Sequence, residues 1–309
     1  MSDDSGRERP PSEPVDRYAG WLVGDLSDAE RHAEIERRRV LDLHDPAALA
    51  ALVAGNPTAA TRPMLGWRDH PLGVSPLSYV AMARYDTGSG RWRDVARTGA
   101  CAQVLLDAGA PVDGDAGDPE TPLMTAASYG DADVARVLIA AGARLDDLAA
   151  PSAGGVPGGS ALLHAAVFGM TDALDVLVAA GARIRSIEEG AAAGELAGWL
   201  RPDVPVQARL RALVMAADHQ RLDAMRALVA AGAPLDEADE VFGRHPLRLA
   251  AANGRAASVE LLLSLGADPR AADADGRTAL DLCRAGRADA IDPSGHDAVE
   301  SILLAATAR

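Results

Sequence analysis

Leucine recurs along this chain in a fixed relation to glycine, and this pattern predicts where helices end. In five alanine-rich apolar segments a leucine lies four residues before a glycine, and a more polar turn follows. Glycine adopts the left-handed backbone at a helix C-terminus without steric penalty, so each segment is expected to be a helix that its glycine ends. The leucines are Leu105, Leu138, Leu177, Leu228 and Leu262, and the glycines are Gly109, Gly142, Gly181, Gly232 and Gly266.

A second pattern predicts where helices begin. It is a Ser, Thr or His followed by Pro or Ala and then by Leu. A Ser or Thr hydroxyl accepts a hydrogen bond from a free amide of the first turn, and Pro at the first helical position has no amide to leave unpaired. Each unit is therefore predicted to be a helix, a short turn, a second helix and an extended turn. The five copies are Ser75-Pro76-Leu77, Thr121-Pro122-Leu123, Ser160-Ala161-Leu162, His245-Pro246-Leu247 and Thr278-Ala279-Leu280.

The spacing of the glycines predicts the architecture. Their steps are 33, 39, 51 and 34 residues, and a period near 33 with insertions is typical of a solenoid of helix pairs. The longer steps contain a Gly/Pro-rich segment at 148–159 and a larger one at 187–207, in which a short helix is expected over Glu195–Leu200. The predicted fold class is an all-α helix-turn-helix repeat solenoid with two long inter-repeat insertions.

Two copies of the unit resemble the ankyrin repeat. The family pattern of Thr-Pro-Leu-His, Ala-Ala-x-x-Gly, Leu-Leu and Gly-Ala-Asp corresponds to residues 121–143 and 245–268. The histidine of that pattern is replaced by Met124 and Arg248, and the unit near Arg211 lacks the Thr-Pro pair. The resemblance covers residues 70–309 and implies an ankyrin-type solenoid, a fold that serves first as a binding surface.

The chain is expected to have three parts. Residues 1–15 are polar and predicted to be disordered, and residues 16–62 are predicted to form a helical N-terminal capping unit with helices over 28–43 and 46–54. Residues 63–309 form the repeat array. Its units lie near 75–113, 121–147, 160–186, 208–238, 245–276 and 277–306.

The composition of the chain argues against several classes of partner and reaction. The net charge is −15 and every one of the 30 basic residues is arginine, which argues against a nucleic-acid partner and excludes lysine-dependent phosphate loops and Schiff-base chemistry. No apolar run suits a membrane helix or a signal peptide, and the two cysteines lie far apart in the repeat register. We expect a cytoplasmic protein without cofactor or metal site. Its arginine- and alanine-rich composition is typical of a GC-rich bacterial genome of actinobacterial type.

Candidate binding residues follow from the register of the resemblance. In ankyrin-type stacks the positions around the Ala-Ala pair face a concave groove, and three of the scarce aromatic rings occupy them here. The same rings also have a plain alternative role as packing between neighbouring repeats. The candidates are Tyr79, Thr125, Ser128, Tyr129, His164, Phe168, Met215, Asp218, His219 and Asn253, together with Trp199 from the larger insertion.

Two functions remain open from the sequence. The first is a binding module that engages a protein partner through the groove and through acidic turns that attract a basic surface. The second is a small-molecule-binding protein or an enzyme, with the 148–159 and 187–207 insertions closing a pocket. Such an enzyme would perform proton transfer, isomerisation, cyclisation or hydrolysis, with His164 or His219 as base and Asp218 beside them.

Overall fold

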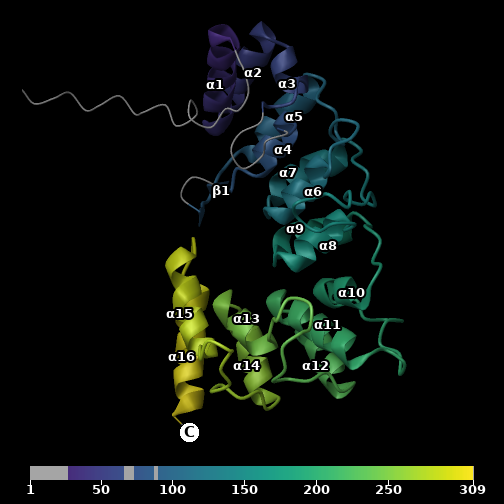
Figure 1. The fold of residues 1–309 in the computed structure, drawn as a ribbon, viewed down its shortest axis with the longest axis vertical. Helices are drawn as coiled ribbons and strands as arrows, with labels where there is room; N and C mark the ends of the chain where they lie inside the picture. Colours follow the sequence, from purple (N-terminus) through teal and green to yellow (C-terminus); the bar gives the residue numbers. More distant parts are fainter. Residues whose placement is uncertain (1–26, 66–72, 87–89, 309) are drawn as a thin grey trace, which may run out of the picture.

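In the computed structural model, helices are stacked along an arc and, in the described residues, are joined by turns and one short hairpin (Figure 1). The structure describes residues 27–65, 73–86 and 90–308, so the predicted disordered tail and residues 16–26 of the predicted capping unit lie outside the described residues. Six helix pairs follow a short N-terminal group, and the stack turns at a single helix, α10 (Ile187–Ala193). The predicted repeat solenoid is therefore confirmed.

The N-terminal group contains the two predicted helices and a third short one. They are α1 (Asp28–Asp42), α2 (Pro46–Gly55) and α3 (Thr58–Thr61). Ser27 begins α1 with a capping box, in which its side chain accepts from the Glu30 amide while the Glu30 carboxylate accepts from the Ser27 amide. Asp45 caps α2 by accepting from the Ala47 amide at 3.0 Å.

The array of the described residues consists of six helix pairs. Each pair has a first helix that opens at one of the predicted starts or, once, at Val206, and a second helix that packs beside it. The pairs are α4 (Pro76–Ala81) with α5 (Thr98–Asp107), α6 (Pro122–Ser128) with α7 (Ala132–Ala140), α8 (Ala161–Val167) with α9 (Thr171–Ala179), α11 (Val206–Asp218) with α12 (Leu222–Ala230), α13 (Pro246–Ala252) with α14 (Ala256–Ser264), and α15 (Ala279–Asp289) with α16 (Ser294–Thr307).

The repeat leucines, the glycines and most of the helix-opening residues have the burial, backbone conformation and hydrogen bonds that the sequence predicts. All five repeat leucines have 0% exposure, and the five glycines have φ between 87° and 103°, the region that favours glycine. The side chains of four helix-opening residues accept a hydrogen bond from the amide three residues on, whereas His245 at the start of α13 makes no such bond. Those four residues are Ser75, Thr121, Ser160 and Thr278.

Two segments differ from the sequence prediction. The lengthened turn of the first unit contains a hairpin, in which β1 (Tyr85–Asp86) pairs antiparallel with β2 (Arg91–Trp92). In the larger insertion the helix is α10, and the expected helix over 195–200 is wrong because that stretch forms a turn. Gly194 ends α10 with φ 81°, and the following turn packs tightly on it: a Cβ at Gly190 would lie 2.7 Å from the Glu195 carbonyl oxygen.

The buried apolar residues form two cores that meet at α10. One core runs from α1 to α9 and includes Ala192 of α10 and Met215 of α11, and the other runs from α10 to α16. Polar groups of the second half reach across to the turn between α8 and α9, where backbone carbonyls at the end of α8 carry negative partial charge. We call this set of contacts the seam. It comprises His219 Nε2 with the Ala166 carbonyl, His219 Nδ1 with Thr171, Arg244 with the Val167 carbonyl, Arg255 with the Gly169 carbonyl and Arg221 with Asp175.

Candidate functional site

Five of the residues expected to line the groove are instead buried. A side chain in the interior is not available to a partner, so these positions do not form an accessible patch, whatever their spacing in the repeat. Their exposed fractions are 5% for Thr125, 0% for His164, 4% for Met215, 3% for Asp218 and 1% for His219.

The 148–159 insertion does fold over His164, but it seals the ring instead of enclosing a cavity. The Glu120 carboxylate accepts from the Gly155 amide at 2.8 Å, and a Cβ at Gly155 would lie 3.0 Å from His164 Cε1. His164 Nδ1 lies 2.8 Å from Ser128 Oγ, which itself donates to the Met124 carbonyl. Burial lowers the pKa of His164 against the raising effect of Glu120, so the ring is neutral packing near neutral pH.

His219 has both ring nitrogens committed to protein groups. Nε2 donates to the Ala166 carbonyl at 3.0 Å, and Nδ1 therefore accepts from the Thr171 hydroxyl at 2.9 Å. Burial lowers the pKa of His219, although the adjacent Asp218 carboxylate raises it. The Asp218 carboxylate accepts from the Asn253 amide and from Arg255. This cluster joins the two halves of the stack and leaves no imidazole nitrogen for a substrate.

Three of the expected aromatic residues also have structural partners. The Tyr129 ring lies 6.3 Å from both Tyr85 and Trp92, so the hairpin and the end of α6 share one aromatic cluster. The Tyr79 hydroxyl donates to Asp42 at 3.0 Å and thereby ties α4 to α1. Trp199 packs against the second core.

Phe168 is the expected residue that remains accessible as a large apolar group. It ends α8 with 40% of its surface exposed, and its ring meets the His164 ring edge-on at a centroid distance of 6.4 Å. The preceding residue, Val167, accepts a hydrogen bond from Arg244 Nη1 at 2.9 Å. The same guanidinium lies over the Phe242 ring, 4.7 Å from its centroid. Arg244 therefore contacts the Phe242 ring and the carbonyl of the residue that precedes Phe168.

Phe242 is held in place by a closed turn, residues 239–244, which we call the Phe242 loop. Asp239 is 3% exposed, and its carboxylate accepts from the amides of Val241, Phe242 and Arg244 at 2.9, 2.8 and 2.8 Å. The Asp239 amide also donates to the Arg244 carbonyl at 2.9 Å. With its backbone groups paired inward, the loop presents Val241 and Phe242 to solvent, 60% and 52% exposed.

Sequence reasoning missed Phe242, because the turn that contains it stands out only for its acidic residues. A signal was nevertheless present: one of only two phenylalanines stands next to a valine inside an acidic run, where apolar side chains have no reason to be buried. We use the name Phe patch for Phe168, Val241, Phe242 and Arg244, which are linked by the contacts of Arg244 with the Val167 carbonyl and the Phe242 ring.

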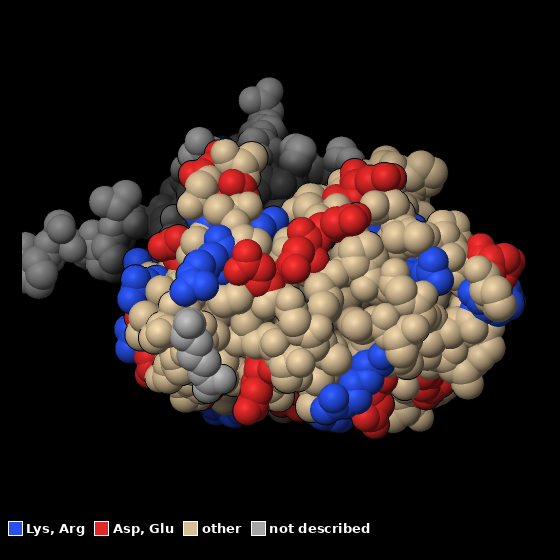
Figure 2. All heavy atoms as spheres, turned by 90° about the horizontal axis from the view of Figure 1, so that it is seen from below, with Lys and Arg blue, Asp and Glu red and all other residues tan. Residues whose placement is uncertain are grey.

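Many of the acidic turn residues have a structural role. In three turns an aspartate accepts from a backbone amide of the next turn along the stack, at 2.9 to 3.0 Å. Glu237 and Glu240, beside the Phe patch, are exposed and make no hydrogen bond or ion pair with the described residues. Figure 2 shows a row of acidic side chains across the face seen from below. The three aspartates are Asp113, Asp146 and Asp236.

The described residues hold no group of three or more side chains arranged to bind a metal ion. Among the described helices, none combines the length and the apolar character that a membrane crossing requires.

The comparison with protein-family models agrees with the repeat architecture. The family model for ankyrin repeats, in three copies, matches residues 94–188 and 201–292. No curated protein has a sequence significantly similar to this one. A similar solved structure is the crystal structure of the human ASB11 ankyrin repeat domain, with a TM-score of 0.40 and 23% identity over 87% of this chain and 96% of that chain. The match to the family model covers more than half of the residues, and the chain belongs to the ankyrin repeat family.

Proposed function

We propose that this protein is a protein-binding module whose contact surface is centred on the Phe patch. Ankyrin repeat domains generally mediate protein–protein interaction. The observation that supports this surface is that Arg244 contacts both the exposed Phe242 ring and the Val167 carbonyl, next to the exposed Phe168. Aromatic and arginine side chains dominate the binding energy of most protein interfaces. Burying an exposed phenylalanine also removes apolar surface from water, which favours association.

The rigidity of the Phe242 loop supports the same proposal. Association loses free energy whenever a mobile side chain or loop must be ordered at the interface. Here Asp239 already pairs three amides of the loop, and Arg244 is held at the Val167 carbonyl. The loop therefore has little order left to gain on binding. A surface that is fixed before the partner arrives is suited to specific recognition.

The charge around the patch defines the kind of partner. Glu237 and Glu240 add two exposed carboxylates beside the exposed rings, in a protein of net charge −15. A complementary partner presents an apolar side chain between arginine or lysine residues. The acidic groups would accelerate the encounter through long-range attraction, and the rings would slow dissociation.

The enzyme alternative has less support. It required an accessible imidazole, and both His164 and His219 lie in the interior. His164 Nδ1 is bonded to Ser128, and the two ring nitrogens of His219 are bonded to Thr171 and the Ala166 carbonyl. The 148–159 insertion closes on His164 without leaving room at the ring. We therefore assign the histidines to packing and the function to the surface.

The test is affinity purification with three forms of the protein, followed by quantitative mass spectrometry. A true partner is retained by the wild type and by Leu148→Ala, a control that truncates another exposed apolar side chain, and is lost with Phe242→Ala. With the purified partner, Phe168→Ala and Phe242→Ala should each weaken the Kd by about 30-fold, which corresponds to about 2 kcal/mol. A partner that binds all of these variants equally would show that the Phe patch is not the contact surface.

A further inference from the structure

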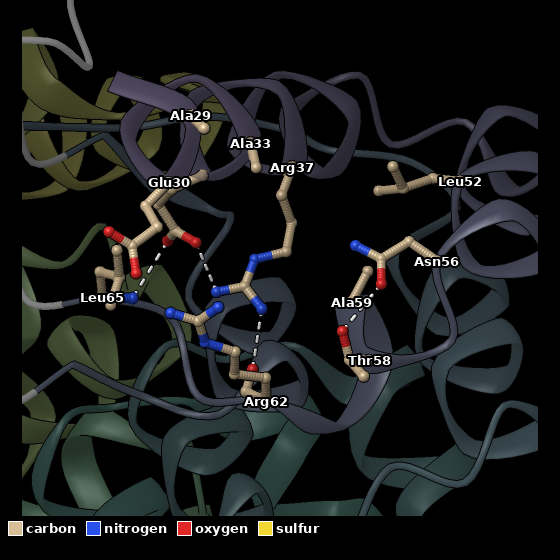
Figure 3. A pocket seen from close by; sticks show the side chains of 11 residues that line it. Ala29, Glu30, Ala33, Arg37, Leu52, Asn56, Thr58, Ala59, Arg62 and Leu65 are labelled. Atoms are coloured by element: carbon tan, nitrogen blue, oxygen red, sulfur yellow. Dashed lines mark hydrogen bonds and ion pairs between the residues drawn. The ribbon is translucent and has the colours of Figure 1, made fainter. Parts of the chain in front are cut away.

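The pocket at the N-terminal end of the stack has no net charge among its lining residues. It has a volume of about 240 Å³ and lies between α1, α2 and α3 (Figure 3). Arg37 and Arg62 line it together with Glu30 and Glu34, and Arg37 pairs with Glu34 at 2.6 Å. Because these charges cancel, the pocket does not select a charged ligand. The aromatic side chains of the repeat array present more specific chemistry.

Four accessible aromatic side chains lie on consecutive units of the array. Tyr85 and Trp92 of the hairpin and Tyr129 at the end of α6 form one cluster, with ring centroids 5.1 to 6.3 Å apart. Phe168 has the equivalent position one unit later, at the end of α8. The residues of the cluster are half-buried, and Phe168 is 40% exposed. We call these four residues the aromatic row, and its Phe168 end belongs to the Phe patch.

Tyr129 and Phe168 leave the stack with the same backbone geometry. They end their helices with φ −96° and −91° and with ψ 4° in both, and each precedes a glycine with φ 67° or 70°. Helices α6 and α8 pack against each other (Figure 1), and Ser128 Oγ lies 2.8 Å from His164 Nδ1 between them. Packed helices are about 8–10 Å apart, so the row presents aromatic rings at steps of about that length.

Hydrogen bonds hold the hairpin beside Tyr129. Arg84 Nη1 donates to the Gly130 carbonyl, and the Arg93 amide donates to the Arg84 carbonyl at 2.9 Å. Arg93 Nε also donates to the Ala83 carbonyl at 2.7 Å. The cluster is therefore ordered before a ligand arrives, which reduces the entropy lost on binding.

The cluster also has hydrogen-bond donors without partners. The Tyr85 and Tyr129 hydroxyls and the Trp92 indole N–H make no hydrogen bond with the described residues, and none of them is sealed from solvent. Burial raises the pKa of Tyr129, as does the nearby Glu120 carboxylate, so its hydroxyl stays protonated near neutral pH. A ligand on the cluster therefore meets three free donors beside apolar ring surface.

A polyproline II segment fits these features better than a helix or a strand. It has three residues per turn and rises about 3.1 Å per residue, so every third residue returns to one face after about 9 Å, close to the step from Tyr129 to Phe168. Its carbonyls have no internal hydrogen bonds and are free to accept from the hydroxyls and the indole. The carbonyls of an α-helix are already paired, and the side chains of a strand return to one face after only about 7 Å.

The two ends of the row differ in charge. At the Phe patch, the exposed carboxylates of Glu237 and Glu240 outnumber the single guanidinium of Arg244. A basic residue of the ligand is therefore favoured at that end. The hairpin end has equal numbers of basic and acidic side chains, namely Arg84, Arg91 and Arg93 with Asp86, Asp94 and Glu120.

We propose that the aromatic row binds a proline-rich segment of a partner protein, with prolines three residues apart on Tyr129 and Phe168 and a basic residue next to Glu237 and Glu240. The proposal rests on the proposed function, because Phe168 belongs to both surfaces. Proline rings pack on the aromatic rings, and the carbonyls between them accept from the three free donors of the cluster.

The experiment is an NMR titration of the whole protein with two peptides of equal composition. One is acetyl-Arg-Pro-Ala-Ala-Pro-Ala-Ala-Pro-Arg amide, and the other is acetyl-Arg-Ala-Ala-Pro-Pro-Pro-Ala-Ala-Arg amide. The first should shift the Trp92 indole and Phe168 ring resonances saturably. The second should bind at least about fivefold more weakly, because its prolines face three different sides of the polyproline helix. Equal affinity of the two peptides would overturn the proposal.

Two conservative substitutions and a control separate recognition from folding. Tyr129→Phe and Trp92→Phe each keep an aromatic ring and remove one donor, so each should weaken the Kd of the first peptide about three- to tenfold. Trp199→Phe alters another half-buried tryptophan, which packs against the second core, and should bind like the wild type. Thermal unfolding of each variant checks that the stack is intact. Full affinity in both Tyr129→Phe and Trp92→Phe would contradict the assignment of the cluster.

The outcomes distinguish this proposal from the proposed function. A partner that is retained by the wild type and lost with Phe242→Ala, together with no saturable shift from the first peptide, would overturn the proline-rich ligand and leave the Phe patch as the contact surface. A partner that binds Phe242→Ala normally while the first peptide binds the row would overturn the Phe patch instead. A Trp92 indole shift that depends on protein concentration without peptide would show that a second copy occupies the row, which would also overturn the proposal.

Discussion

Leu177→Ala tests whether the repeat leucines bear the stability of the stack. Leu177 lies on α9 with 0% exposure, in the first core and close to the α10 bend. Helix α9 packs against α7 and α8, so the leucine is enclosed by its own repeat and the preceding one. Truncation to alanine leaves the backbone and the helix propensity nearly unchanged and removes only buried apolar volume.

The expected cost follows from two contributions. The substitution removes three carbon atoms, and at about 0.8 kcal/mol for each buried methylene the loss of transfer free energy is roughly 2.4 kcal/mol. If half of the vacated space persists, a cavity of about 40 Å³ adds roughly 1 kcal/mol. We therefore expect the free energy of unfolding to fall by about 3 to 4 kcal/mol. In a stack whose units touch only their neighbours, the unfolding transition should also broaden.

Urea denaturation followed by far-UV circular dichroism measures this effect. The matched control is Leu148→Ala, because Leu148 is 58% exposed and its truncation should change the free energy of unfolding by less than about 0.5 kcal/mol. Native-state hydrogen exchange should show the largest loss of protection in α7, α8 and α9. A change below about 0.5 kcal/mol for Leu177→Ala would refute the repeat register on which the fold prediction rests.

Three further predictions concern single features. His245→Thr should stabilise the protein by about 0.5–2 kcal/mol in thermal or urea unfolding, since it supplies the missing N-cap of α13, and a destabilised variant would contradict this. Burial lowers the pKa of His245 from its ordinary value of 6.5 to about 4, so between these two pH values the unfolded protein binds a proton that the folded protein does not. The free energy of unfolding should therefore be highest above pH 6.5 and fall by up to about 3 kcal/mol towards pH 4. A urea midpoint that does not change over this range would exclude the effect. Glu237→Lys with Glu240→Lys should slow association with a basic partner and weaken its salt dependence in surface plasmon resonance, whereas an unchanged on-rate would remove the steering role.

The parts of the fold that could be predicted are those in which local chemistry repeats. A glycine that needs a left-handed backbone, a hydroxyl that caps a helix and a leucine that must be buried each act over four or five residues. The sequence therefore contains them in full, and the structure has them at the predicted positions. His245 is the exception. It stands at a predicted helix start but has no hydroxyl, and α13 lacks a side-chain cap.

The exposure of the candidate residues could not be predicted, because it depends on segments outside the repeat. His164 would face the groove if the stack were regular, but Gly155 of the 148–159 insertion lies against its ring. His219 is buried because α10 redirects the stack, which places the end of α11 against Ala166 and Thr171. Both contacts depend on segments that do not recur from repeat to repeat, so the repeat pattern cannot predict them.

Acidic residues in the same turn have different roles in the structure. Asp239 and Glu240 are neighbours in one acidic run, and from the sequence both are equal candidates for attracting a basic partner. The structure buries Asp239 under three amides and leaves Glu240 exposed. Reversing the charge of Asp239 would therefore disrupt the loop itself, so a test of electrostatic attraction has to be confined to Glu237 and Glu240.

The exclusive use of arginine gives the seam its specificity and links the fold to the proposed surface. Arg255 donates to the Asp218 carboxylate through Nε and to the Gly169 carbonyl through Nη2, and Arg221 similarly joins the Ala192 carbonyl to Asp175. A lysine has all three of its donors on a single nitrogen, whereas the guanidinium reaches these acceptors through two different nitrogens. Arg244 has the same geometry with a different second contact: its guanidinium holds the Val167 carbonyl and places its face on Phe242. The interaction that joins Arg244 to the end of α8 thus also places its guanidinium against the exposed ring, so the proposed binding surface depends on the junction between the two halves of the stack.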